Sequence, residues 1–76
     1  MAIRAYVLIQ TEVGKAAAVA DTVRAIEGVE SAENVTGPYD VIARATTDTV
    51  EELGRVVVNQ IQRVEGISRT LTCPIV

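Results

Sequence analysis

Apolar and polar residues follow two different periods in the first half of the chain. Apolar side chains occupy every second position of residues 3–10, which predicts a β-strand with one buried face. Over residues 16–26 they recur at spacings of three and four, which predicts an amphipathic helix. Gly28 is placed to end that helix in a left-handed cap, and residues 29–35 form a second, more polar strand.

The second half of the chain repeats this order. Residues 39–46 alternate again and predict a third strand, which Gly37 and Pro38 join to the second as a hairpin. Residues 68–73 alternate as a fourth strand. Pro74 suits an edge strand, where one missing backbone donor is tolerated.

A second helix is predicted between the last two strands. Its apolar stripe runs from Val50 to Val64, and Gly66 is placed to end it. Asp48 is expected to cap the helix, with Glu51 at the spacing of a capping box.

An internal repeat fixes the topology that we expect. Ile26-Glu27-Gly28-Val29 recurs as Val64-Glu65-Gly66-Ile67, and each copy closes a helix and begins a strand. The order is therefore βαββαβ with right-handed crossovers, which is the ferredoxin-like pattern of the α+β class. We expect one domain over residues 1–76, with the first and third strands in the centre of an antiparallel sheet and both helices on one face.

The other face of this sheet is left without a cover. Its expected side chains include several large apolar ones, namely Tyr6, Leu8, Ile42 and Leu71. Because an apolar patch of this kind usually marks an interface, we predict a homodimer that packs sheet to sheet. The alternative is a monomer in which Arg4, Arg44 and Thr46 solvate the face.

Composition narrows the class of function. The chain has 76 residues, no Trp or Phe and a net charge of −3, so its core must be aliphatic and a direct contact with nucleic acid is not expected. No apolar run is long enough to span a membrane. With Cys73 as the single cysteine and no signal-peptide pattern at the start, we expect a cytoplasmic protein.

The chain contains few of the residue types that catalysis and metal binding usually require. The chain contains no His and one Cys, so it offers neither a neutral-pH acid or base of the usual kind nor a zinc site. It also lacks a glycine-rich phosphate loop. We therefore expect no enzyme activity, no cofactor and no metal.

The residues that remain could bind a small polar ligand. Gly37, Tyr39 and Asp40 lie in the predicted hairpin turn, and Thr70 and Thr72 present hydroxyls from one face of the fourth strand. The Asp40 carboxylate could hold an ammonium group while backbone N–H groups hold a carboxylate, which suits a free amino acid. The alternatives are a turn that only connects two strands, a Tyr39 that packs, and threonines that are ordinary strand residues.

Together these segments resemble a known family. The chain is similar to the C-terminal effector (RAM) domain of the Lrp/AsnC regulators in the following parts: Gly37-Pro38-Tyr39-Asp40 before an aliphatic strand, the helix with Val57 and Ile61, and Val64-Glu65-Gly66-Ile67 followed by Thr70 and Thr72. The resemblance covers nearly the whole chain. It departs from the family in lacking the N-terminal helix-turn-helix, so we expect a stand-alone effector domain.

The resemblance carries its own expectations. It implies a dimeric α/β barrel that assembles further, commonly into an octamer of four dimers, and that binds amino acids between dimers near Gly37, Tyr39 and Asp40, with Thr70 and Thr72 as less central members. It also implies regulation of transcription, through ligand-dependent assembly or co-assembly with full-length Lrp/AsnC regulators. The alternative function is a small enzyme of the dimeric α+β barrel type.

Overall fold

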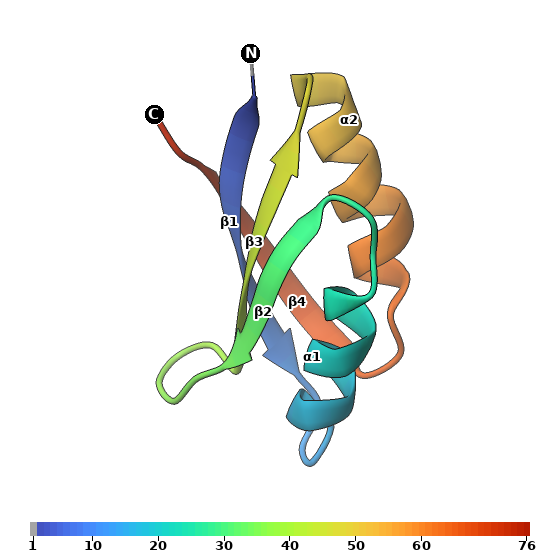
Figure 1. The fold of residues 1–76 in the computed structure, drawn as a ribbon. Coiled ribbons are helices and arrows are strands. Elements are labelled where there is room, and N and C mark those ends of the chain that lie inside the picture. Colours follow the sequence, from blue (N-terminus) through green and yellow to red (C-terminus); the bar gives the residue numbers. More distant parts are fainter. Residues whose placement is uncertain (1) are drawn as a thin grey trace.

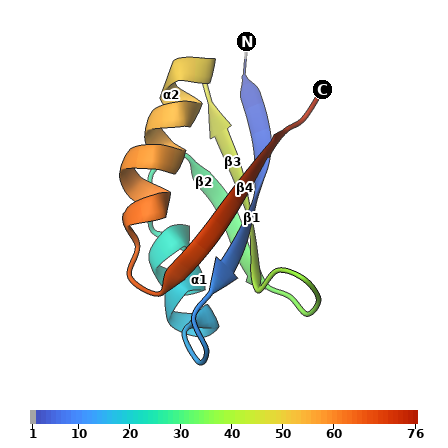
Figure 2. The same cartoon turned by 180° about the vertical axis from the view of Figure 1, so that it is seen from behind.

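Four antiparallel strands form one sheet, and both helices cover the same face of it (Figures 1 and 2). The computed structural model describes residues 2–76. The elements follow in the order β1 (Ile3–Thr11), α1 (Ala16–Arg24), β2 (Val29–Asn34), β3 (Val41–Thr47), α2 (Val50–Arg55), a π-helical turn η1 (Val56–Gln60), a 3-10 turn η2 (Ile61–Arg63) and β4 (Ile67–Pro74). The strand order β2-β3-β1-β4 confirms the ferredoxin-like βαββαβ fold, with β1 and β3 central.

Short aliphatic side chains build the core between the sheet and the helices. The sheet contributes four buried alanines, which let the helices lie close to the strands: Ala5, Ala32, Ala43 and Ala45. Larger core residues come from both layers, and Ile9, Val19 and Ile61 are fully buried. Both tyrosines lie outside this core, as an aliphatic composition predicts.

The strand register places a row of large side chains on the face that carries no helix. Leu8 pairs with Ile42 on one side and with Leu71 on the other, and Tyr6 pairs with Arg44 and Cys73. Paired residues of neighbouring strands project from the same face. Tyr6 and Leu71 remain 41% and 47% exposed. The structure thus confirms the predicted open face.

The second helix differs from its prediction at its N-cap, within its length and at its end. Its N-cap is Thr49, whose hydroxyl accepts a hydrogen bond from the Glu52 backbone N–H at 3.1 Å, and not Asp48. A β-branched hydroxyl one position later satisfies the helix N-terminus, because Thr49 has the extended backbone that a cap requires and Asp48 precedes it. The predicted single helix also changes hydrogen-bonding pattern at Val56, where η1 begins. Its last turn, η2, ends at Arg63 with Val64 as the C-cap, so Gly66 lies in the turn before β4 and is not the helix cap.

The first helix ends earlier than its sequence suggests. It stops at Arg24, and Ala25 caps it with a right-handed backbone, so Gly28 is not the helix cap. Gly28 instead turns the chain into β2 at a φ of 96°, and its carbonyl oxygen accepts a hydrogen bond from the Thr46 N–H at 2.8 Å. The glycine therefore joins the turn to β3.

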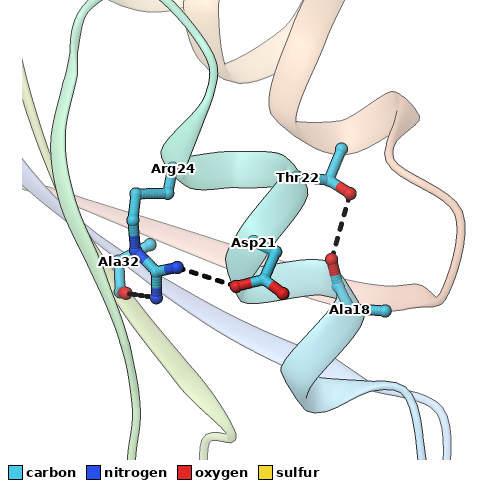
Figure 3. A network of polar contacts seen from close by, with 5 residues as sticks. All are labelled: Ala18, Asp21, Thr22, Arg24 and Ala32. Carbon is cyan, nitrogen blue, oxygen red and sulfur yellow. Dashed lines mark hydrogen bonds and ion pairs between the residues drawn. The ribbon is translucent and has the colours of Figure 1, made fainter.

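A polar network ties α1 to the outer edge of the sheet (Figure 3). The Arg24 guanidinium donates to the Asp21 carboxylate at 2.8 Å and to the backbone oxygen of Ala32 at 2.6 Å. Ala32 belongs to β2, which is an edge strand. Arg24 thus occupies a backbone acceptor that the edge would otherwise offer to another strand.

Candidate functional site

The turn between β2 and β3 projects from the body of the molecule. In both ribbon views it lies away from the helices, at the end of the sheet opposite the two chain termini (Figures 1 and 2). Gly37 adopts a φ of 131°, and the Val35 N–H donates to the Asp40 carbonyl oxygen at 2.9 Å to close the loop. Strand β3 begins at Val41, so Tyr39 and Asp40 belong to the turn, as the turn prediction has it, and the predicted strand start at residue 39 is two residues too early.

Asp40 fastens the turn to the end of β1. Its backbone N–H donates to the Ile9 carbonyl oxygen at 2.9 Å, and its carboxylate atom Oδ2 accepts a hydrogen bond from the Thr11 N–H at 2.8 Å. The Gln10 side-chain amide adds a third link by donating to the Pro38 carbonyl oxygen at 2.9 Å. Within residues 2–76 these bonds leave the second carboxylate oxygen of Asp40 without a donor, which is the acceptor that an ammonium group would need.

Gln10 and Thr11 were missed in the sequence. Both lie at the end of a strand whose alternating pattern marks only its apolar face. Their contribution comes through a side-chain amide and a backbone N–H, neither of which has a pattern of its own. The β-bulge between Gln10 and Thr11 is where the register of β1 with β4 shifts.

Thr70 and Thr72 lie in a different environment from the turn. They pair with Ile9 and Val7, which places them on the helix-covered face of β4. The Thr70 hydroxyl accepts a hydrogen bond from the Gln62 side-chain amide at 3.0 Å. Thr72 borders a largely apolar hollow of about 280 Å³ together with Leu53 and Val57.

The five candidate residues therefore fall into two groups. The structure brings Gly37, Tyr39 and Asp40 together in one loop, and it places Thr70 and Thr72 across β1 on the edge strand β4. Strand β1 separates the two groups, because Ile9 bonds to Asp40 on one side and pairs with Thr70 on the other.

The open face carries a charged and aromatic pair. The Arg44 guanidinium carbon lies 5.8 Å from the centre of the Tyr6 ring, a distance suited to a cation–π contact. Hydrogen bonding and charge interaction with the Tyr6 hydroxyl raise the pKa of Arg44 above its ordinary value. Both side chains border a hollow of about 280 Å³, which also touches Glu33 and Ile42. The exposed Arg44 side chain thus lies over the Tyr6 ring on the open face.

Metal sites and membrane spans are absent from residues 2–76. No group of three or more His, Cys, Asp or Glu side chains in that range is arranged to hold a metal ion. No helix there has the length and apolar character to cross a membrane.

Comparison with known proteins assigns the family. The model of the Lrp/AsnC ligand binding domain matches residues 4–76. An uncharacterized HTH-type transcriptional regulator of Pyrococcus horikoshii, PH1916, is 30% identical over 54 residues, which are 71% of this chain and 36% of that protein. The chain thus spans little more than a third of this curated relative.

Solved structures share the fold. TTHA0845 from Thermus thermophilus superposes with a TM-score of 0.92 at 35% identity, covering 97% of this chain and 92% of that one. The transcriptional regulator NMB0573 of Neisseria meningitidis, solved as an L-Met complex, superposes with a TM-score of 0.85 at 17% identity, covering 97% of this chain and 49% of that one. The match of the family model over residues 4–76, on a βαββαβ fold with an open sheet face, establishes that this chain belongs to the Lrp/AsnC ligand-binding domain family.

Proposed function

We propose that this chain is an amino-acid-binding regulatory domain that modulates transcription through ligand-dependent assembly, either with itself or with full-length Lrp/AsnC regulators. The observation that carries the proposal is the turn at residues 37–40. Three hydrogen bonds fix it to β1, while one oxygen of the Asp40 carboxylate stays available. A loop fixed in this way, with one carboxylate oxygen free to accept a hydrogen bond, is preorganised for a ligand, so less conformational entropy is lost on binding.

The chemistry of the ligand follows from the turn. The free oxygen of Asp40 takes the ammonium group, and the backbone around Gly37, which no neighbouring atom crowds, lets a carboxylate approach closely. Tyr39 is half-buried beside them and supplies an aromatic wall. The L-Met complex of the structurally similar Neisseria regulator supports an amino acid as the ligand class.

The site is completed by a second molecule. The turn projects from the sheet, so a single chain leaves one side of a bound amino acid in water (Figures 1 and 2). Two chains pack through their open faces into a dimer, and dimers associate further, up to an octamer of four, around the turns. Ligand binding favours the assembly that encloses it, because only differential affinity for two states can shift their balance.

The domain acts by binding and not by catalysis, and it works in the cytoplasm with a DNA-binding partner. The full-length regulators of the family supply that partner. Thr70 and Thr72 belong to the site only if a neighbouring molecule's turn reaches β4, because β1 separates them from the turn of their own chain.

Calorimetric titration with the twenty amino acids tests the proposal, and two variants of Asp40 sharpen it. Asp40→Asn keeps an oxygen for the Thr11 N–H but loses the charge, so we expect normal folding and at least about tenfold weaker binding. Asp40→Ala loses both and should weaken the turn as well as binding. Normal affinity of Asp40→Asn would mean that the carboxylate serves the turn alone, and binding of none of the twenty would contradict the proposal.

A further inference from the structure

A third hollow lies at the end of the sheet opposite the turn. Its volume is about 410 Å³, within the range of about 300–1,000 Å³ that is usual for small-molecule sites. Three segments form it: the loop from α1 to β2, the end of β3, and the second helix. In Figure 1 that loop passes beside α2. The lining residues are Glu27, Gly28, Thr47, Glu52, Arg55, Val56 and Gln60.

The floor of this hollow is formed by Val56 and by Thr47, whose hydroxyl already has a hydrogen-bond partner. Thr47 and Val56 are each only 8% exposed, and the Thr47 hydroxyl donates to the Thr49 carbonyl oxygen at 2.8 Å. Gly28 leaves the base open, since a Cβ there would lie 3.4 Å from the Val56 Cγ2 atom. The base therefore suits the aliphatic part of a ligand.

The walls carry unpaired charges of both signs. Glu27, Glu52 and Arg55 border the same space, yet the ion pair between Arg24 and Asp21 is the only one among residues 2–76. Within that range the three side chains also make no hydrogen bond to each other. Two carboxylates and one guanidinium that share a hollow without pairing complement a ligand with two cationic groups and one anionic group.

The second helix widens at this place. The π-helical turn η1 begins at Val56 and ends at Gln60, and both residues line the hollow. A π-helical turn closes i→i+5 hydrogen bonds, so it is wider than an α-helical turn, and such turns are frequent at functional sites. The irregular segment thus coincides with the charged hollow.

We propose that this hollow binds a dibasic amino acid of the size of lysine. The ligand carboxylate lies on the planar fork of Arg55, its two ammonium groups lie on Glu27 and Glu52, and its methylene chain covers Val56. The site is separate from the turn at residues 37–40, so it stands or falls independently of the function proposed above.

Titration of the complete chain with L-lysine tests the site, with two probes that each lack one charged group. Norleucine keeps the chain and the α-groups but lacks the distal ammonium, and 1,5-diaminopentane lacks the carboxylate. We expect lysine to bind and each probe to bind at least about tenfold more weakly. Equal affinity for the three ligands, or no binding of lysine, would overturn the proposal.

Paired variants and chemical shifts locate the binding. Glu52→Gln and Arg55→Gln should each weaken lysine binding about tenfold or more, while Glu51→Gln, on the same helix but outside the hollow, should leave it unchanged. Amide shifts should change at residues 27, 28, 52 and 55. Equal losses in Glu51→Gln and Glu52→Gln, or shifts confined to residues 37–40, would refute the second site and leave the proposed effector site standing.

Discussion

Gly66 shows how one residue links backbone conformation to packing. Its φ is 97°, and a Cβ built on it would lie 3.0 Å from the Lys15 Cβ atom and 3.1 Å from the Val19 Cγ2 atom. Its carbonyl oxygen accepts a hydrogen bond from the Glu12 N–H at 2.7 Å. The turn that follows the second helix can therefore approach the start of α1 only because this position has no side chain.

Replacing Gly66 by Ala should destabilise the protein more than the same change at Gly14. Gly14 also has a positive φ of 79°, but no atom lies within 4 Å of a Cβ there, so Gly14→Ala adds only backbone strain of about 1 kcal/mol. Gly66→Ala adds overpacking against α1 and should cost about 1–3 kcal/mol more. Urea unfolding of the two variants measures the difference in unfolding free energy. Equal losses would show that α1 can shift to accommodate the added methyl group without loss of stability.

Asp40 marks the limit of what a residue pattern predicts. A carboxylate beside Gly-Pro-Tyr could be placed in a turn from the sequence, because glycine and proline define turns. Its hydrogen bond to the Thr11 N–H could not, since that contact joins two segments far apart in the chain and depends on the strand register. Local signals identify the residue, and tertiary structure gives it its partner.

At the scale of elements, the cap of the second helix gives a direct comparison of neighbours. Thr49→Ala removes the hydroxyl that accepts the Glu52 N–H and should cost about 1 kcal/mol of unfolding free energy. Asp48→Ala should cost less than about 0.5 kcal/mol, because Asp48 is exposed and does not form the cap. The urea midpoints of the two variants test this prediction. A larger loss of stability in Asp48→Ala would mean that Asp48 is the N-cap, as the sequence suggested.

Arg24 holds α1 against the edge strand β2, and its two bonds can be separated. Arg24→Met loses both bonds and should cost about 1 kcal/mol, chiefly from the lost donor to the Ala32 carbonyl oxygen. Asp21→Asn removes the exposed ion pair alone and should change stability by less than about 0.5 kcal/mol. If Asp21→Asn were the more damaging variant, the stabilisation would reside in the ion pair and not in the bond to the strand.

Element boundaries were less predictable than element types. All four strands and both helical segments follow from the apolar period, because that period records which face is buried. The early end of α1 and the change of helix type at Val56 do not, since apolar residues continue at helical spacing beyond Arg24 and through Ile61. The apolar stripe records which side chains are buried, and buried side chains continue beyond the point where regular α-helical hydrogen bonding ends.

At the scale of the whole molecule, the open face of the sheet is the surface through which we propose that two chains dimerise. Leu71 on that face and Val50 on α2 are both exposed apolar residues, at 47% and 67%. Leu71→Lys should convert the proposed dimer to a monomer, because each copy would bury an unpaired ammonium group at the shared interface. Val50→Lys carries the same charge on the helix side and should leave the dimer intact.

Sedimentation at micromolar concentration distinguishes the two variants. Monomers for Leu71→Lys and dimers for Val50→Lys place the contact on the open face. Dimers for both would move the interface elsewhere, and a monomeric unmodified chain would contradict the dimer itself.

The two tyrosines give this molecule a built-in optical readout. The chain has no Trp or Phe, Tyr6 lies on the open face, and Tyr39 lies in the turn that we propose as the effector site. Ultraviolet emission therefore comes from two fluorophores alone, one at each surface of interest. With Tyr6 changed to Phe the signal reports the turn, and with Tyr39 changed to Phe it reports the sheet, so ligand capture and self-association can be followed separately without an added dye.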